Sequence, residues 1–180
     1  MTVEHLLAPF AWSPTAGGRP AHRLSRLRRE AIVAAPRDET FAFFSDAANL
    51  ERLTPPWLKF RITTPMPITM GVGAEFEYRI VLHGITIPWR TQIDEWEPGR
   101  RFVDRQLQGP YRWWRHEHRF ESVEGGTRVI DDVEYLPRAN WLVAGWVRRD
   151  VERIFAFRQD ALTREFDTRL RAGMLLQRLS

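Results

Sequence analysis

The sequence VRRDVERIFAFRQDALTREFDTRL, residues 147–170, predicts the long helix around which the rest of the chain is organised. Its apolar residues recur every three or four positions and share one broad face, which has to be buried. This face contains Val147, Val151, Ile154, Phe155, Phe157, Ala161, Leu162 and Phe166. Two charged residues, Arg158 and Glu165, lie within the same face. A buried charge is costly without a partner, so we expect a partner or a function for each.

The composition predicts one globular domain, because 180 residues, 43% of them hydrophobic and 12% aromatic, are enough to bury a sizeable core. We place this domain at residues 29–172. An N-terminal extension at residues 1–28, rich in proline, glycine and arginine, is expected to be loosely packed or disordered, and residues 173–180 form a C-terminal tail. No apolar run approaches membrane-spanning length, and the first residues lack the order of a signal peptide, so we expect a cytoplasmic protein.

Charge and cysteine usage exclude several classes of function. The chain has no cysteine, which excludes disulfides, thiolate metal sites and thiol catalysis. Its net charge of +4 and its eight tryptophans could suit a nucleic acid. However, Lys59 is the only lysine, and the arginines are spread along the chain and largely balanced by 23 acidic residues. We therefore expect no nucleic-acid partner.

The first half of the domain is expected to contain short elements. Residues 30–35 read as a strand that Pro36 ends, and residues 37–44 read as a helix that this proline and two acidic residues begin. Residues 45–54 read as a second short helix, and residues 58–63 as a strand.

The second half reads as an antiparallel meander, because period-two segments are separated by short turns. The expected strands are residues 75–82, 85–96, 101–108, 112–122 and 127–135. Two-residue turns at His83-Gly84, Pro98-Gly99 and Gly125-Gly126 would place apolar side chains on one common face. The expected cross-strand pairs include Tyr78 with Trp89, Ile93 with Asp104, Thr91 with Gln106, Phe120 with Asp131, His118 with Val133, and Arg119 beside Asp132 on the outer face. At Gly109-Pro110 the inward side chains of the two flanking strands lie on the same face of the sheet only if the loop has an odd number of residues or a bulge.

One apolar face of the predicted sheet would pack against the long helix. The inward-facing positions also include Asp104, Gln106, His116, His118, Asp131 and Arg158. These are too many polar groups for a solid core, since each buried one needs a partner. We therefore expect a partly hydrated pocket between the helix and the sheet.

Four motifs carry a resemblance to a known family. They are FSDAANLERLTPPWL at residues 44–58, Phe102-x-Asp104-x-Gln106-x-x-Gly109-Pro110-Tyr111, Trp114-x-His116-x-His118-x-Phe120 and Phe155-x-Phe157-Arg158. In these motifs the chain resembles the START-like superfamily, also called SRPBCC, and most closely its bacterial cyclase/dehydrase-like, ligand-binding branch. The resemblance covers residues 30–170. It implies an α+β helix-grip fold, a curved antiparallel sheet of six to seven strands around a long C-terminal helix, with two short helices after the first strand. It also implies a hydrophobic ligand cavity, used in relatives for aromatic polyketide cyclisation, lipid transfer or hormone binding.

The function that we favour from the sequence is binding of a small hydrophobic or amphipathic, lipid- or polyketide-like molecule. Arg158 and the histidines would hydrogen-bond a carboxylate, hydroxyl or carbonyl at its polar end. The expected ligand-binding residues are Tyr78, Trp89, Asp104, Gln106, Trp114, His116, His118, Phe120, Tyr135, Trp141, Ile154 and Arg158. Trp141 would belong to a lid over the pocket mouth.

Several alternatives stay open. The first is a cofactor-independent cyclase or dehydrase, with His116, His118, Asp104 and Asp131 as candidate catalytic groups and tyrosines as proton donors. A second is a buried network of the same residues that only fixes the helix on the sheet. The His-x-His pair with a carboxylate could hold Zn²⁺ or Fe²⁺, but the glycine and glutamate spacings of cupins are not met, so we expect no metal or other cofactor. Contact with a membrane surface is a less favoured alternative.

Overall fold

The computed structural model describes residues 24–138 and 141–177, and the side chains of residues 24–138 and 145–172. The N-terminal extension expected before the domain therefore lies, up to residue 23, outside the described residues. The described elements are β1 (Ser25–Val33), α1 (Arg37–Phe44), 3-10 helices at Ala47–Leu50 and Pro56–Leu58, β2 (Arg61–Ile62), β3 (Glu75–Leu82), β4 (Ile85–Glu97), β5 (Arg101–Gln108), β6 (Tyr111–Val123), β7 (Gly126–Pro137) and α2 (Trp141–Gln177).

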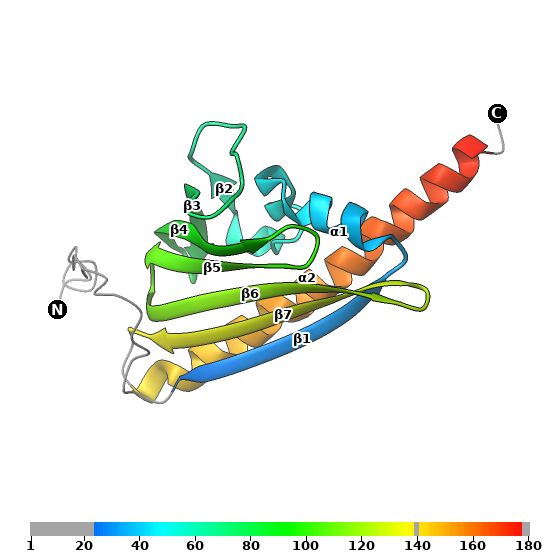
Figure 1. Cartoon of the computed structure of the whole chain (residues 1–180). Coiled ribbons are helices and arrows are strands. Elements are labelled where there is room, and N and C mark those ends of the chain that lie inside the picture. The colour runs from blue at the N-terminus through cyan, green and yellow to red at the C-terminus, as the bar shows by residue number, and fades with distance from the viewer. Residues whose placement is uncertain (1–23, 139–140, 178–180) are drawn as a thin grey trace.

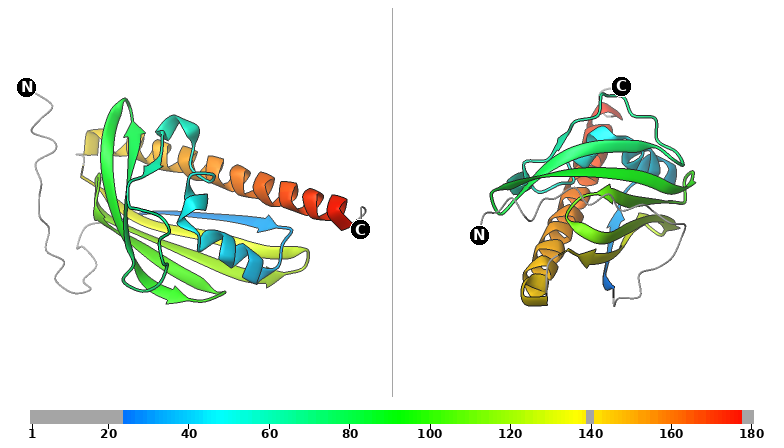
Figure 2. Two further views of the ribbon diagram at one scale, coloured as in Figure 1. Left: turned by 90° about the horizontal axis from the view of Figure 1, so that it is seen from above. Right: turned by 90° about the vertical axis from the view of Figure 1, so that its left-hand side faces the viewer.

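The seven strands form one antiparallel sheet in the order β1-β7-β6-β5-β4-β3-β2. The sheet is curved, and α2 lies along its inner face and extends beyond it at its C-terminal end (Figures 1 and 2). The segment from α1 to the second 3-10 helix lies between the ends of the two edge strands (Figure 1). This arrangement confirms the helix-grip architecture expected from the sequence. None of the described helices has a stretch apolar enough to span a membrane.

Both ends of the domain differ from the expectation. β1 begins at Ser25 rather than at residue 30, and it pairs with β7 along its whole length, from Ser25 opposite Tyr135 to Val33 opposite Thr127. The arginines at its start were interpreted as part of an extension, but Arg26 lies on the outer face and forms an ion pair with Asp132. At the other end α2 continues to Gln177 instead of ending near Leu170. The expected domain limits, 29 and 172, thus fall inside β1 and α2.

The segment between α1 and β3 is less regular than expected. Residues 45–54 form one 3-10 helix, capped by the Asp46 side chain, followed by turns, because the short polar residues around it favour local side-chain bonds over a continuous α-helix. The strand expected at residues 58–63 is reduced to Arg61–Ile62. Pro55 and Pro56 begin a 3-10 helix that ends at Lys59 with a left-handed backbone, which removes the first residues of that strand from the sheet.

The β3–β4 register confirms the predicted hairpin, since Tyr78 pairs with Trp89. Between β4 and β5 the predicted pairs Thr91 with Gln106 and Ile93 with Asp104 are present, but the two-residue turn predicted at Pro98-Gly99 is wrong. Glu97 pairs with Arg101, so the loop has three residues, and a bulge between Ile93 and Glu95 restores the predicted pairs. The β5–β6 pairing meets the requirement of the faces, since Asp104 pairs with His116 and Phe102 with His118, so that an odd number of residues, centred on Pro110, separates the partners.

The β6–β7 register was predicted two residues away from its observed position. His118 pairs with Asp131 and Phe120 with Val129, so the pairs His118 with Val133 and Phe120 with Asp131 are wrong. The turn is centred on Glu124-Gly125, and Gly125 takes the left-handed backbone (φ 83°) that favours glycine. Arg119 pairs with Ile130 and touches Asp132 only diagonally, at 4.0 Å. A slip of two residues keeps every side chain on its face, so the inward set is unchanged.

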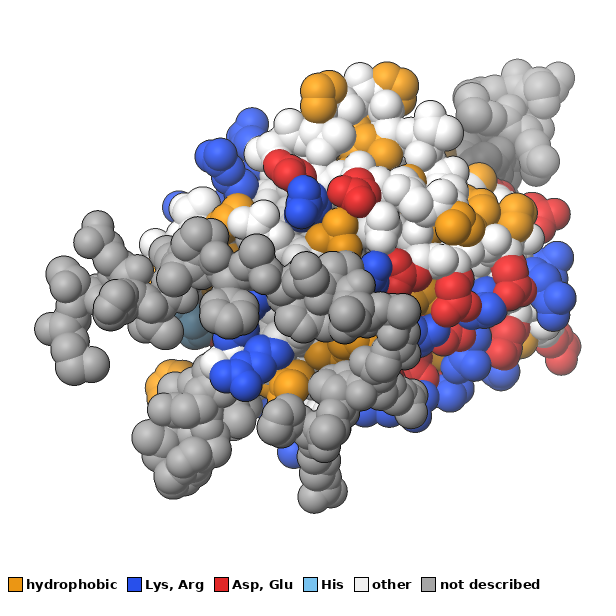
Figure 3. Space-filling view, turned by 60° about the vertical axis from the view of Figure 1, so that its left-hand side comes forward, with side chains coloured by type: hydrophobic (Ala, Val, Ile, Leu, Met, Phe, Trp, Pro, Cys, Tyr) orange, Lys and Arg blue, Asp and Glu red, His pale blue; other side chains and the backbone are white. Residues whose placement is uncertain are grey.

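The two faces of the sheet differ in chemistry. The inner face packs into two apolar clusters, one around α1 and the C-terminal half of α2 and the other around the N-terminal half of α2. The outer face carries ion pairs such as Arg105 with Asp94 and Arg115 with Glu117. Figure 3 shows acidic and basic side chains interspersed over one side of the molecule. The core and any internal site therefore lie between the sheet and α2.

Candidate functional site

A cavity of about 170 Å³ lies between the inner face of the sheet and the N-terminal half of α2. Its wall is mostly apolar and aromatic. It is lined by Leu50, Leu53, Thr54, Leu58, Phe60, Phe76, Tyr78, Ile80, Leu82, Trp89, Thr91, Asp104, Pro110, Tyr111, Trp114, His116, His118, Val147, Asp150, Val151, Ile154, Phe155 and Arg158. A smaller cavity of about 60 Å³ shares Leu50, Leu53, Phe76, Asp104, His118 and Arg158 with it. The polar side chains thus stand at the boundary between two chambers.

Three of these polar residues come from adjacent strands. His116 and His118 alternate with outward residues on β6, and Asp104 of β5 pairs directly with His116. The two imidazole rings lie 3.7 Å apart between centroids. Asp104 Oδ2 lies 2.9 Å from His118 Nε2 and 3.6 Å from His116 Nδ1. Asp104 is the most exposed of the three side chains, at 18% against 8% and 6%, so the carboxylate stands at the cavity surface.

Asp131 contacts both histidines, and Arg158 contacts Asp131. Asp131 Oδ1 lies 2.9 Å from His116 Nε2 and 3.1 Å from His118 Nδ1. Arg158 donates from Nε to Asp131 Oδ2 at 3.1 Å, and its Nη2 lies 3.4 Å from His118 Nδ1. Because the Asp131 carboxylate lies nearer to His118 Nδ1 than the Arg158 guanidinium does, we assign a proton to this nitrogen, which donates it to Asp131. The arginine on the apolar face of α2 therefore has the partner that the sequence required.

Burial and neighbouring charges separate the pKa values of the two histidines. Burial and the adjacent His118 lower the pKa of His116, against the opposing effect of Asp131. Burial also disfavours charge on His118, but hydrogen bonds to Asp104 and Asp131 outweigh it and raise the pKa of His118. His118 therefore holds its proton more tightly than His116, so that His116 is the first of the pair to become neutral as the pH rises.

The carboxylates remain ionised and the cavity tyrosine neutral. Burial opposes ionisation of Asp131, but the Arg158 guanidinium and hydrogen bonds from both histidines hold its pKa well below the usual value. Burial also opposes ionisation of Asp104, but the hydrogen bond from His118, together with the nearby charges of His116, His118 and Arg158, outweighs burial and lowers the pKa of Asp104. Burial, with the Asp104 charge, raises the pKa of Tyr78 well above 10, so this side chain is a hydrogen-bond donor at the cavity wall.

The structure brings most of the predicted ligand-binding residues together but not all. Tyr78, Trp89, Asp104, Trp114, His116, His118, Ile154 and Arg158 line the cavity. Gln106 does not, because its amide donates to and accepts from the Tyr111 backbone in the β5–β6 loop. Phe120 packs against Phe41 and Phe44 in the core instead, and Tyr135 lies behind Tyr111 and Trp114. The predicted lid residue Trp141 lies outside the described side chains.

Other lining residues were missed from the sequence. Leu50, Leu53, Leu58 and Phe60 come from the irregular segment between α1 and β3 and close one side of the cavity. The sequence predicted a short helix at residues 45–54, but not what its Leu50 and Leu53 would face. Asp150 of α2 lines the other end and forms an ion pair with the exposed His83 at 2.7 Å, so this end adjoins solvent.

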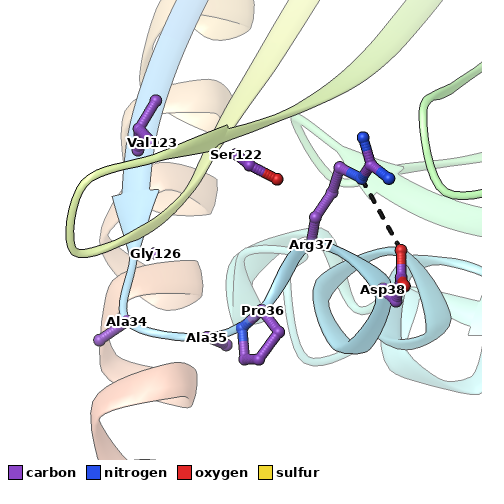
Figure 4. A pocket seen from close by; sticks show the side chains of 8 residues that line it. All are labelled: Ala34, Ala35, Pro36, Arg37, Asp38, Ser122, Val123 and Gly126. Carbon is purple, nitrogen blue, oxygen red and sulfur yellow. Dashed lines mark ion pairs between the residues drawn. The ribbon is translucent and has the colours of Figure 1, made fainter.

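Two further features can be compared with this cavity. One nitrogen or oxygen of each of Asp104, His116 and His118 lies within 4.8 Å of the other two, a separation that a shared metal ion allows. An open hollow of about 560 Å³ lies at the α1 end of the sheet, where the start of α1, with Arg37 and Asp38, and the end of β6, with Ser122, line it (Figure 4). It contains none of the predicted site residues, and its Arg37–Asp38 contact of 3.7 Å is a weak surface pair.

Comparison with solved structures supports the same fold. An aromatase/cyclase from Streptomyces sp. R1128, Zhui, is 20% identical and superimposes with a TM-score of 0.69, covering 84% of this chain and 98% of its own. Ara h 8.0201 is 15% identical, with a TM-score of 0.59 and coverage of 81% and 99%. The di-domain aromatase/cyclase StfQ of the steffimycin biosynthetic pathway is 14% identical, with a TM-score of 0.63 and coverage of 82% and 52%. At these identities the likeness concerns the fold alone.

The sequence itself also matches a family. No curated protein sequence gave a significant match. The family described as polyketide cyclase / dehydrase and lipid transport matches residues 33–161, which is more than half of the chain and includes Asp104, both histidines, Asp131 and Arg158. The chain therefore belongs to the polyketide cyclase / dehydrase and lipid transport family, within the START-like superfamily whose fold it shares.

Proposed function

We propose that the chain binds a small, mostly apolar molecule in the cavity between α2 and the sheet, with the polar end of the molecule at the Asp104–His116–His118–Arg158 wall. The observation that carries this proposal is a space lined mostly by aromatic and aliphatic side chains, with buried charged groups converging on one wall. A site that is mostly apolar with a few convergent polar groups is typical of small-molecule binding.

The volume limits the size of the ligand. A cavity of about 150 Å³ in another protein takes up benzene. The space of about 170 Å³ here suits one aromatic ring, or two with slight widening, or a short acyl chain. A longer ligand would have to extend past Asp150 into solvent or join the second chamber of about 60 Å³.

Arg158 determines which polar group of a ligand the site would prefer. Its guanidinium uses Nε for Asp131 and lies on the walls of both chambers. The remaining donors of a planar guanidinium suit a carboxylate or carbonyl oxygen. An acidic aromatic ligand would therefore bind more tightly than a neutral one of the same shape.

Arg158→Ala tests this proposal with 2-naphthoate and the neutral 2-naphthalenemethanol as probes, measured by isothermal titration calorimetry. A hydrogen bond to a charged group contributes about 1.5–3 kcal/mol, so we expect the affinity for 2-naphthoate to fall about 10- to 150-fold and that for the alcohol to change far less.

The matched control is Arg164→Ala, which removes an exposed arginine from the same helix and should leave both affinities unchanged. Melting temperatures of the three proteins show the effect on folding. An equal loss of affinity for both probes, in step with the melting temperature, would instead favour a purely structural network of buried charges.

A second candidate function, acid/base catalysis without a cofactor, is favoured by the opposite pKa shifts of His116 and His118. Neighbouring groups with such separated pKa values are suited to act as base and acid in one reaction. His116 would remove a proton next to a carbonyl, and the neutral Tyr78 would donate a hydrogen bond to the developing oxyanion.

Exchange of the α-protons of 2-tetralone in D₂O, followed by ¹H NMR, measures this activity. We expect His116→Gln to slow the protein-catalysed exchange about 10²- to 10⁴-fold, the range that a positioned general base contributes. The exposed His83 provides the control, since His83→Gln should not change the rate. Exchange no faster than in buffer would leave ligand binding as the function.

A further inference from the structure

We propose that Asp104, His116 and His118 form a binding site for a divalent transition-metal ion of the zinc type, with its remaining coordination positions open to the cavity. The site uses the cavity of the proposed function but does not depend on an organic ligand. It departs from the expectation from the sequence, where the His-x-His pair was set aside because the spacings around it did not fit a cupin. The fold places Asp104, one of the two carboxylates that could join this pair, on the neighbouring strand directly opposite His116.

The distances between the donor atoms are close to those of a metal site. Metal–ligand bonds of about 2.0–2.1 Å in tetrahedral geometry place neighbouring ligand atoms about 3.4 Å apart. Asp104 Oδ2 lies 3.6 Å from His116 Nδ1 and 2.9 Å from His118 Nε2, on either side of that value. All three donors lie within 4.8 Å of one another, so small rotations of the rings would bring them to one ion.

The other ring nitrogen of each histidine already has the partner that a metal ligand requires. A histidine that binds a metal through one nitrogen usually donates the other N–H to a carboxylate or carbonyl, which fixes the ring. His116 Nε2 and His118 Nδ1 lie 2.9 and 3.1 Å from the same Asp131 oxygen. Arg158 in turn holds the second oxygen of Asp131 at 3.1 Å. A network that served only to fill the core would not require both rings to turn their outer nitrogens to one carboxylate.

The charge and position of the group favour a cation at the cavity surface. Asp104 and Asp131 carry two negative charges and Arg158 one positive charge, so the group presents a net charge of −1 to a cation that binds both histidines in their neutral form. The donors lie on adjacent strands of one sheet, which holds them more rigidly than loops would. Two nitrogens and one oxygen on one side, with space opposite, suit Zn²⁺ or Fe²⁺, and the open positions would take water or a ligand oxygen.

The test is a titration of the untagged full-length chain, treated with EDTA and dialysed, with ZnCl₂ by isothermal titration calorimetry in the absence of any organic ligand. We expect one Zn²⁺ per chain and a rise in melting temperature on binding. His116→Gln and Asp104→Asn should each weaken binding at least about 100-fold, because each removes one of three ligands. His83→Gln is the matched control, since the exposed His83 also pairs with a carboxylate, Asp150, but does not itself line the cavity.

The wild-type chain alone decides the case if a variant fails to fold. Co²⁺ should give it a visible absorption spectrum of a four- or five-coordinate nitrogen–oxygen site that ZnCl₂ removes. Absence of Zn²⁺ binding by the wild type, or binding of unchanged affinity in both His116→Gln and Asp104→Asn, would overturn the proposal. Naphthoate binding by the EDTA-treated protein, measured separately, would still support the proposed function, so the two failures are distinguishable.

Discussion

Arg158 and Glu165 lie on the same apolar face of α2 but have different roles in the structure. Glu165 forms ion pairs of 2.8 Å with Arg52, from the turns after the first 3-10 helix, and with Arg169 one turn along α2. Through Arg52, Glu165 connects α2 to the segment that closes one side of the cavity. Arg158 faces the cavity and holds Asp131. The sequence showed that each charge needed a partner, but it could not identify partners that lie far away in the chain.

The two histidines should make opposite contributions to the pH dependence of stability. The raised pKa of His118 stabilises the fold below its ordinary value of 6.5, and this contribution is lost as the pH rises through the higher value in the folded protein. The lowered pKa of His116 acts in the reverse direction, since the unfolded chain takes up that proton first, and stability is lost as the pH falls below 6.5.

Urea unfolding of the wild type, His118→Gln and His116→Gln between pH 5 and 9, followed by tryptophan fluorescence, measures both effects. We expect the difference in free energy of unfolding between wild type and His118→Gln to shrink as the pH rises, and the difference for His116→Gln to grow. Parallel curves for the three proteins would show that the histidines do not differ in the folded state as described.

At the level of elements, the hairpins explain why most of the sheet could be predicted. Alternation of apolar and polar residues fixes which side chains face inward, and any register error of two residues leaves that set unchanged. This is why the β6–β7 shift moved His118 from Val133 to Asp131 without moving either histidine to the outer face. The same parity brought Asp104 beside His116. The turn position itself was missed because either of two adjacent glycines satisfies the pattern.

The existence of the cavity could be predicted from the sequence, but its shape could not. Too many inward polar groups implied a space between α2 and the sheet, and eight of the twelve expected lining residues are on its wall. Gln106, Phe120 and Tyr135 share the inward face, yet they pack against the β5–β6 loop or the core. The packing of Leu53 and Phe60, which belong to an irregular segment, decides which inward residues line the cavity. No periodicity in the sequence predicts that packing.

At the scale of the whole molecule, the fold separates stability from binding. The outer face of the sheet carries partly exposed ion pairs, each worth about 1 kcal/mol. The C-terminal half of α2 packs with α1 into a cluster rich in phenylalanines. The other half of α2 leaves the cavity unfilled and places Arg158 at the boundary of its two chambers. A protein whose only requirement was a stable core would have no reason to keep this space open beside five ionisable groups.

The most direct measurement is a crystal structure of the chain with 6-bromo-2-naphthoate, in which anomalous scattering locates the bromine without reference to a model of the ligand. We predict one strong bromine peak between α2 and the sheet, in contact with Trp89 or Trp114, with the carboxylate toward Arg158, and no such peak in Ile154→Trp, where the new side chain fills the cavity. A bromine bound only on the outer surface, or a cavity closed by its own side chains at saturating ligand, would contradict the account.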